Sequence, residues 1–144
     1  MKFNYILIIG LILAALLVAG CTSSSGDAAY NKYSQMSASD IKSQAAYVYG
    51  PDFLTNPDNY KDQLIDMVAV IDQSTGDDNG ENAYIVNLNK EPSGTPYYAQ
   101  LDFTASDGSR FLSGDRLIVY GIYEGNSNSN GQPIVMGLVT TGDD

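Results

Sequence analysis

The sequence predicts an all-β, or mainly β, domain: a small five-stranded barrel with one or two short helices at its N-terminal end. Five apolar segments lie between residues 64 and 140, and turn-forming residues separate them. Most of these segments alternate apolar and polar side chains, which is the period of a half-buried strand. Two segments contain an internal glycine, which lets a strand bend. Closure into a barrel is expected because it removes the exposed edges of such short strands.

The residues before the strands carry helix signals. Residues 37–49 contain good helix formers, and Ser37 or Ser39 can cap the helix N-terminus. Asp40 falls in the first turn, where a carboxylate interacts favourably with the helix dipole. A second helical turn is expected over residues 50–54, because the Asn-Pro-Asp-Asn sequence that follows disfavours helical backbone.

The first three strands are expected at residues 64–71, 83–89 and 97–103. Alternate residues of a strand share a face. In each of these strands one face is more apolar than the other. The apolar faces consist of Ile65, Met67, Ala69 and Ile71, then Tyr84, Val86 and Leu88, then Tyr97, Ala99, Leu101 and Phe103.

The fourth strand is expected at residues 116–123 and the fifth at residues 134–140. The fourth is apolar on both faces, which is typical of a central strand covered on both sides. Gly121 in its middle indicates a bulge or a sharp bend, and Gly137 indicates a second kink. Strands that bend in this way are those that small barrels use to close.

This pattern best matches an OB-fold, a small Greek-key barrel. Residues 49–61, with their Asn-Pro-Asp-x-Tyr-Lys run, and residues 111–121, with their Leu, Gly-Asp and Tyr-Gly pattern, resemble a group of secreted or lipid-anchored OB-fold proteins of the tRNA-anticodon-binding-like type. The group usually has glycine where this chain has Asp62 and Ala69, and aspartate tolerates left-handed backbone better than most residues. The resemblance implies a fold and an exported location, and it implies no activity.

Residues 1–20 are predicted to be a signal peptide. The apolar run from Tyr5 to Ala19 is shorter than the roughly 20 residues that span a bilayer, and it ends in small residues. The sequence Leu-Val-Ala-Gly-Cys at 17–21 resembles the lipobox of prokaryotic lipoproteins, which implies cleavage before Cys21 and a diacylglyceryl group on its thiol. Two acyl chains anchor a protein stably. The alternative is an uncleaved N-terminal anchor with an incidental cysteine.

The expected organisation is therefore a signal peptide, a tether and one domain. The lipidated Cys21 and a flexible tether occupy residues 21–36, since residues 22–27 contain no apolar side chain. An OB-fold-like domain with its N-terminal helical segment occupies residues 37–144. The protein is expected to be exported and lipid-anchored on the outer face of the cytoplasmic membrane or in the cell envelope.

The charge of the chain disfavours polyanionic partners. The formal net charge is −10, and removing the leader takes away Lys2 and leaves 6 basic against 17 acidic residues. Binding to nucleic acid or to anionic lipid headgroups depends on lysine and arginine. Arg110 and Arg116 are the only arginines. The composition therefore argues against a nucleic-acid partner, although single-stranded binding, common among OB-folds, stays an alternative.

The chemistry of the side chains predicts a protein that is not an enzyme and holds no cofactor. The chain has no histidine, and acylation of Cys21 would leave no free thiol. Its lysines fall in expected loops or on an exposed helix, where no burial lowers the pKa of an amine. A carboxylate pair of the glycosidase type is the remaining alternative, but a barrel this small offers little cleft for a sugar.

An acidic loop between the first two strands is a candidate cation site. Asp77, Asp78 and Glu81 lie there, with Asp72 and Asn79 beside them. Hard cations such as Ca²⁺ prefer oxygen ligands of this kind, although the spacing is not that of an EF-hand. The alternative is a solvated acidic turn.

The second and third strands form the candidate ligand-binding face. This surface would present Asn87, Tyr98 and Gln100, with the asparagines of the 126–130 loop beside them. Tyr98 can stack on a sugar or a base, so the expected partner is a glycan or a protein of the envelope. A shift of one residue in the second strand would expose Tyr84 instead. The alternatives are an ordinary strand tyrosine and a purely structural lipoprotein that binds nothing specifically.

Overall fold

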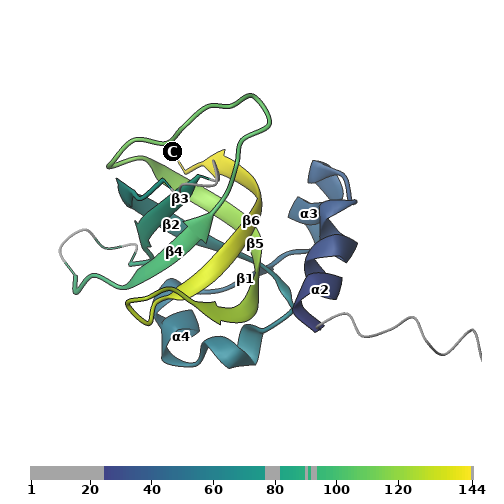
Figure 1. Cartoon of the computed structure of the whole chain (residues 1–144), viewed down its shortest axis with the longest axis horizontal. Coiled ribbons are helices and arrows are strands. Elements are labelled where there is room, and N and C mark those ends of the chain that lie inside the picture. The colour runs from purple at the N-terminus through teal and green to yellow at the C-terminus, as the bar shows by residue number, and fades with distance from the viewer. Residues whose placement is uncertain (1–24, 77–81, 90, 92–93, 144) are drawn as a thin grey trace, which may run out of the picture.

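The computed structural model describes residues 25–76, 82–89, 91 and 94–143. Over these residues the protein is mainly β, as predicted, with six strands in one sheet and three short α-helices (Figure 1). The helices are α2 (Ser25–Ser34), α3 (Ala38–Gln44) and α4 (Gly50–Thr55), and a 3-10 turn (Pro57–Tyr60) follows α4.

The first helix differs from the expected flexible tether over residues 21–36. α2 is helical from Ser25, and Ala29 and Tyr33 on it pack against a buried cluster that contains Leu64 and Ile122. Residues four apart share one face of a helix. Burial of that face on the sheet therefore outweighs the serine- and glycine-rich composition that predicted a coil.

The second helix begins where the sequence indicates and ends early. The backbone N–H of Asp40 donates to Ser37 Oγ at 3.1 Å, so Ser37 is the cap. The helix ends at Gln44 instead of residue 49, and the two-residue strand β1 (Ala46–Tyr47) follows. β1 pairs in parallel with the next strand, and these sheet contacts replace a further helical turn.

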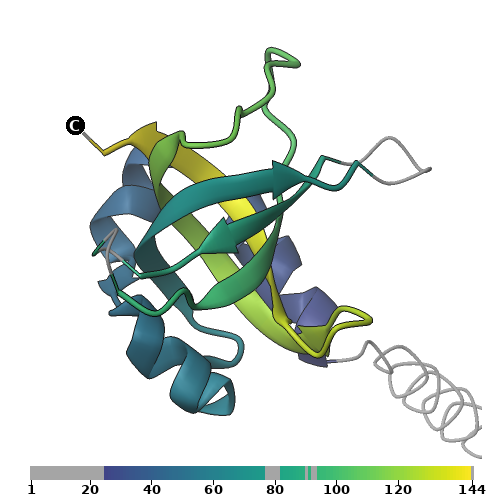
Figure 2. The ribbon, with the colours of Figure 1, turned by 90° about the vertical axis from the view of Figure 1, so that its left-hand side faces the viewer.

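All five expected apolar segments are strands. Their bounds are β2 (Leu64–Ser74), β3 (Ala83–Asn87), β4 (Tyr98–Asp102), β5 (Arg116–Ser127) and β6 (Pro133–Gly142). The order in the sheet is β1-β2-β3-β4-β6-β5, and β5 also pairs with β2 from Leu64↔Ile122 to Val70↔Arg116. β4 and β6 are parallel. The sheet therefore curls into a partly closed ring (Figure 2).

The inside of the ring is the main core. The apolar faces expected for β2 and β3 are buried there, together with Ala99 and Leu101 of β4. Phe53 from α4 is fully buried against this core, with its ring edge-on to Tyr123 at a centroid distance of 5.5 Å. The interior void measures only about 10 Å³, too little for more than one water molecule. The ring interior is therefore packed and leaves no room for a ligand.

One backbone feature confirms a local prediction, and two further positions can be compared with the pattern of the resembled group. The β5–β6 register shifts between Tyr120 and Gly121, and a Cβ on Gly121 would lie 2.4 Å from the carbonyl oxygen of Met136. Asp62 has φ +61°, so it holds the left-handed position that glycine usually fills in the resembled group. At Ala69 the β2–β5 register is regular, so the group's bulge is absent from that pairing.

Candidate functional site

The outer face of β4 carries the predicted ligand-binding residues. Tyr98 is 37% exposed at the start of the strand, and Gln100 and Asp102 follow it on the same face. Asn87 of β3 is the direct cross-strand partner of Tyr98. The structure therefore brings Asn87, Tyr98 and Gln100 together, as the alternation of the two strands indicates.

Asn87 has a structural task within this face. Its side-chain oxygen Oδ1 accepts the backbone N–H groups of Asn89 at 2.9 Å and of Tyr97 at 3.0 Å. These bonds fix the end of the β3–β4 pair and occupy the carbonyl end of the amide. Only the Nδ2 donor is left for a ligand.

The β5–β6 loop lies beside Tyr98. Gln100 pairs with Ile134 of β6, so the residues just before Ile134 lie next to the start of β4. In this loop Asn128 Oδ1 accepts the backbone N–H groups of Asn130 and Gln132, each at 3.0 Å. Asn128 therefore shapes the loop, while Asn126 and Asn130 are exposed to solvent.

Further tyrosines stand at this end of the ring, and the sequence did not indicate them. Tyr97 was expected on the core face, yet it is 38% exposed because the strand begins only at Tyr98. Leu88 donates its backbone N–H to the carbonyl of Tyr97 at 2.7 Å. A Cβ on Gly50 would lie 2.2 Å from the Leu88 carbonyl oxygen, so α4 meets β3 here and brings exposed Tyr49 to the same end.

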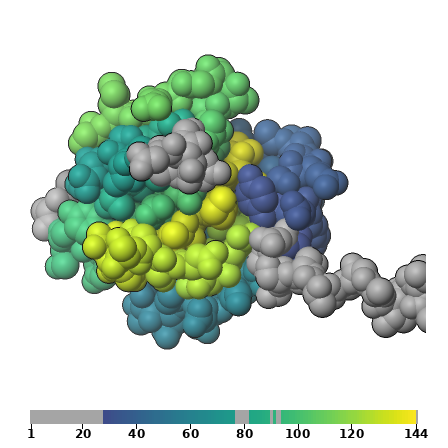
Figure 3. All heavy atoms as spheres, viewed as in Figure 1, coloured from purple at the N-terminus to yellow at the C-terminus, as the bar shows by residue number. Residues whose placement is uncertain are grey.

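A cavity of about 380 Å³ opens at the other end of the β4 face. The helices α2 and α3 form one side of the cavity. The outer side of β6 and the end of β4 form the other. The helices stand against one side of the ring, next to β6 (Figure 3). Sequence reasoning missed this site because three distant segments form it. Its walls are Tyr30, Ser34, Met36, Ala38, Ile41, Asp102, Phe103, Thr104, Met136, Gly137, Leu138 and Val139.

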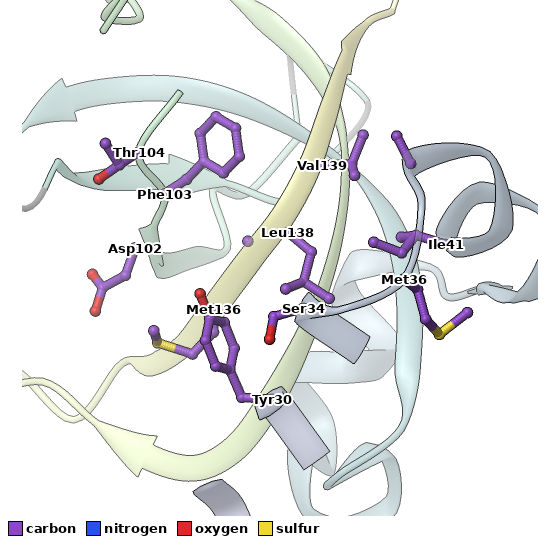
Figure 4. Close-up of a pocket in the computed structure, with 12 residues that line it drawn as sticks. Tyr30, Ser34, Met36, Ile41, Asp102, Phe103, Thr104, Met136, Leu138 and Val139 are labelled. Atoms are coloured by element: carbon purple, nitrogen blue, oxygen red, sulfur yellow. The ribbon is translucent and has the colours of Figure 1, made fainter. Parts of the chain in front are cut away.

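Figure 4 shows how the side chains surround this cavity. Tyr30 and Ser34 point from α2 toward β6, while Ile41 lies on the far side, at α3. Asp102 lies at the rim on the β4 side, and its Oδ1 accepts the Gln100 Nε2–H at 2.8 Å. This hydrogen bond connects the tyrosine-bearing face of β4 with the cavity.

Several predicted sites lie outside the described residues. These are the leader at 1–20, Cys21, and the acidic residues Asp77, Asp78 and Glu81. Within the part of the chain that the structure describes, no three histidine, cysteine, aspartate or glutamate side chains gather as metal ligands. In that same part, no helix has the length and apolar composition needed to cross a bilayer.

The two arginines do not form a basic groove. Arg116 makes an ion pair with Asp143, and the backbone N–H of Asp143 donates to the Arg116 carbonyl at 3.1 Å. Arg110 is exposed on the loop that precedes β5. Neither arginine lines the cavity, and neither lies on the strands that form the Tyr98 face.

No protein-family model matches this chain, and no curated protein matches it. Function is therefore inferred from the chain's own residues.

Proposed function

We propose that this protein is an exported, lipid-anchored and non-catalytic binding module built on an OB-fold-like barrel. The strand pairing supports this fold: β2, β3 and β4 pair in sequence, β6 inserts beside β4, and β5 returns to β2. A five-stranded, partly open barrel of this kind is the OB-fold arrangement. In this interpretation β1 is an addition at the edge of β2.

The anchor is proposed from the sequence at residues 17–21. Acylation of Cys21 would place two acyl chains on the mature N-terminus, which suffices for stable membrane attachment. α2 begins at Ser25, so only residues 22–24 separate it from Cys21. Such a segment reaches about 10 Å when fully extended. The ring would therefore stay close to the membrane surface.

The exposed ring of Tyr98 is the single observation that carries the binding function. It stands on the outer face of β3 and β4, which are the second and third strands of the barrel. OB-folds commonly bind oligomeric ligands by this surface. An exposed tyrosine presents an apolar face and a polar tip. The side-chain amides of Gln100 and Asn87 lie beside it. An aromatic ring flanked by amides suits a sugar, so the ligand that we propose is a glycan of the cell envelope.

The two other functions fit these residues less well. Single-stranded nucleic acid needs a basic groove with stacking aromatics. The chain has a net charge of −10, Arg116 is paired with Asp143, and neither β3 nor β4, the described strands of the Tyr98 face, contains a lysine or arginine. A purely structural lipoprotein has no need of an exposed aromatic ring beside amide side chains on one strand face.

A Tyr98→Ala variant tests the proposed face. Binding of the full chain to isolated envelope glycans should fall about tenfold, if stacking of a sugar on the ring matches the lower end of the roughly 1–3 kcal/mol that a base gains on one aromatic side chain. The fold should stay intact, since Tyr98 is exposed. Circular dichroism and the melting temperature verify this.

Leu112→Ala is the matched control. Leu112 is 71% exposed on the loop before β5, at the opposite end of that strand from the β5–β6 loop. Its removal should leave glycan binding unchanged. Equal binding by the wild type and Tyr98→Ala would exclude this face as the glycan site.

A further inference from the structure

The cavity beneath α2 and α3 has the size of a small-molecule site and a wall of mixed polarity. Its volume of about 380 Å³ lies within the usual range for ligand pockets, roughly 300–1,000 Å³. Polar and apolar surface line it in nearly equal measure, and the apolar part comes from Met36, Ile41, Met136, Leu138 and Val139. A site of this kind takes a ligand with an apolar body and leaves a few polar groups to orient its head.

The polar groups of the cavity favour a positively charged head. Among the described residues that line the cavity, Asp102 is the only charged one. Gln100 occupies its Oδ1, and no lysine or arginine among the described residues forms an ion pair with it. The aromatic ring of Tyr30 also stands beside this space, and the face of such a ring attracts cations.

We propose that this cavity binds a small organic ammonium ion, with its alkyl or aryl body against β6 and its ammonium group beside Asp102. The proposal goes beyond glycan binding and uses a different part of the surface. An ammonium donates up to three hydrogen bonds, and charge-assisted bonds to a carboxylate are the stronger kind. The chain's net charge of −10 would also concentrate cations near its surface.

Two methionines make the proposal directly measurable. Met36 and Met136 both line the cavity, whereas Met67 is buried inside the ring. The full chain, labelled with ¹³C at its methionine methyl groups and placed in neutral phosphatidylcholine nanodiscs, reports each environment separately by NMR. Three probes of equal length are n-hexylammonium, 1-hexanol and hexanoate, and empty nanodiscs correct for partitioning into lipid.

Hexylammonium should shift the Met36 and Met136 methyl signals saturably and leave the Met67 signal in place. Its dissociation constant should be about tenfold lower than that of hexanol, because of the charge-assisted contact with Asp102. Hexanoate should bind more weakly than hexanol. Equal affinities for all three probes, or no shift at either wall methionine, would overturn the proposal.

Variants separate the local carboxylate from the overall charge. Asp102→Asn should raise the hexylammonium dissociation constant about tenfold and leave hexanol binding unchanged. Asp107→Asn removes the same charge from an exposed loop residue outside the cavity. This variant should change the hexylammonium dissociation constant less than about twofold. Equal effects of the two variants would contradict a site at Asp102.

A filled cavity provides the last control. Ala38 is an exposed residue at the start of α3 and lines the cavity, so Ala38→Phe should weaken both hexylammonium and hexanol while the protein stays folded. Unchanged binding by that variant would place the probes elsewhere and refute the site.

Discussion

The ring interior and the layer beneath the N-terminal helices are two apolar regions with opposite packing. Inside the ring, fifteen buried side chains leave a void of only about 10 Å³. Under α2 and α3, three buried residues, Ile41, Leu64 and Ile122, are joined by partly buried neighbours, and a cavity of about 380 Å³ stays open beside them. One sheet therefore has a filled inner face and an incompletely covered outer face.

The filled inner face contributes stability, whereas the incompletely covered outer face offers room for binding. Close-packed interiors lose free energy whenever a side chain is shortened. A loosely covered face can accept a small molecule without disturbing that interior. Both proposed sites lie outside the ring and share strand β4: the Tyr98 face lies on β3 and β4, and the cavity lies over the end of β4 and β6.

Phe53→Ala should show the largest effect on the inner region. Phe53 is fully buried and touches the rings of Tyr60 and Tyr123. Its truncation should lower the free energy of unfolding by about 3–5 kcal/mol. Chemical denaturation measures this loss. A change below 1 kcal/mol would show that the ring interior is not the tightly packed region.

Ile41→Ala should have a smaller effect in the outer region. Ile41 is only 3% exposed, but it borders a cavity that already admits solvent. Its removal enlarges an open space and creates no closed void, so the loss should be about 2 kcal/mol, at the low end for such substitutions. The same denaturation experiment applies. A loss equal to that of Phe53→Ala would abolish the distinction between the two regions.

Of the three substitutions, Tyr123→Phe should lower the free energy of unfolding least. The sign of this effect should change only in alkaline solution. Burial first, and then the negative charge of Asp58, raises the pKa of Tyr123 above its ordinary 10.0. The folded state therefore holds the proton more tightly than the unfolded state. That contribution to stability is complete below pH 10 and declines as the pH rises through the raised pKa.

At pH 7 Tyr123→Phe should cost about 1 kcal/mol, because the hydrogen bond to Asp58 is lost. Above pH 10 the wild type should lose stability more steeply than the variant. Denaturation midpoints measured between pH 7 and 11 reveal this, and parallel curves for the two proteins would contradict a raised pKa at Tyr123.

Local sequence patterns predicted the features that depend only on residues close together in the chain, such as strand faces and a bulge. The alternation of β2 placed Ile65 and Met67 on the core face, and glycine at 121 marked the bulge. A signal for α2 was also present, since Ala29, Tyr33 and Met36 repeat at helical spacing. The polar composition before Ala28 outweighed it in the prediction of a tether.

The remaining features depend on contacts between distant segments. Strand β1 has two residues, too few for any period, and forms because it can pair with β2. The cavity joins α2, α3, the end of β4 and β6, which only the fold brings together. Alternation correctly placed Asn87 on the outer face of the sheet beside Tyr98, but its structural bonds to Asn89 and Tyr97 were not predictable from alternation.

Attachment at the membrane surface is the premise that gives both outer sites their biological setting. Intact-mass spectrometry of the full chain, extracted from the membranes of cells that express it, tests this premise most directly. We expect a mature protein that begins at Cys21 and carries a diacylglyceryl group on that residue. A protein that keeps residues 1–20, or that has an unmodified Cys21, would contradict lipid anchoring.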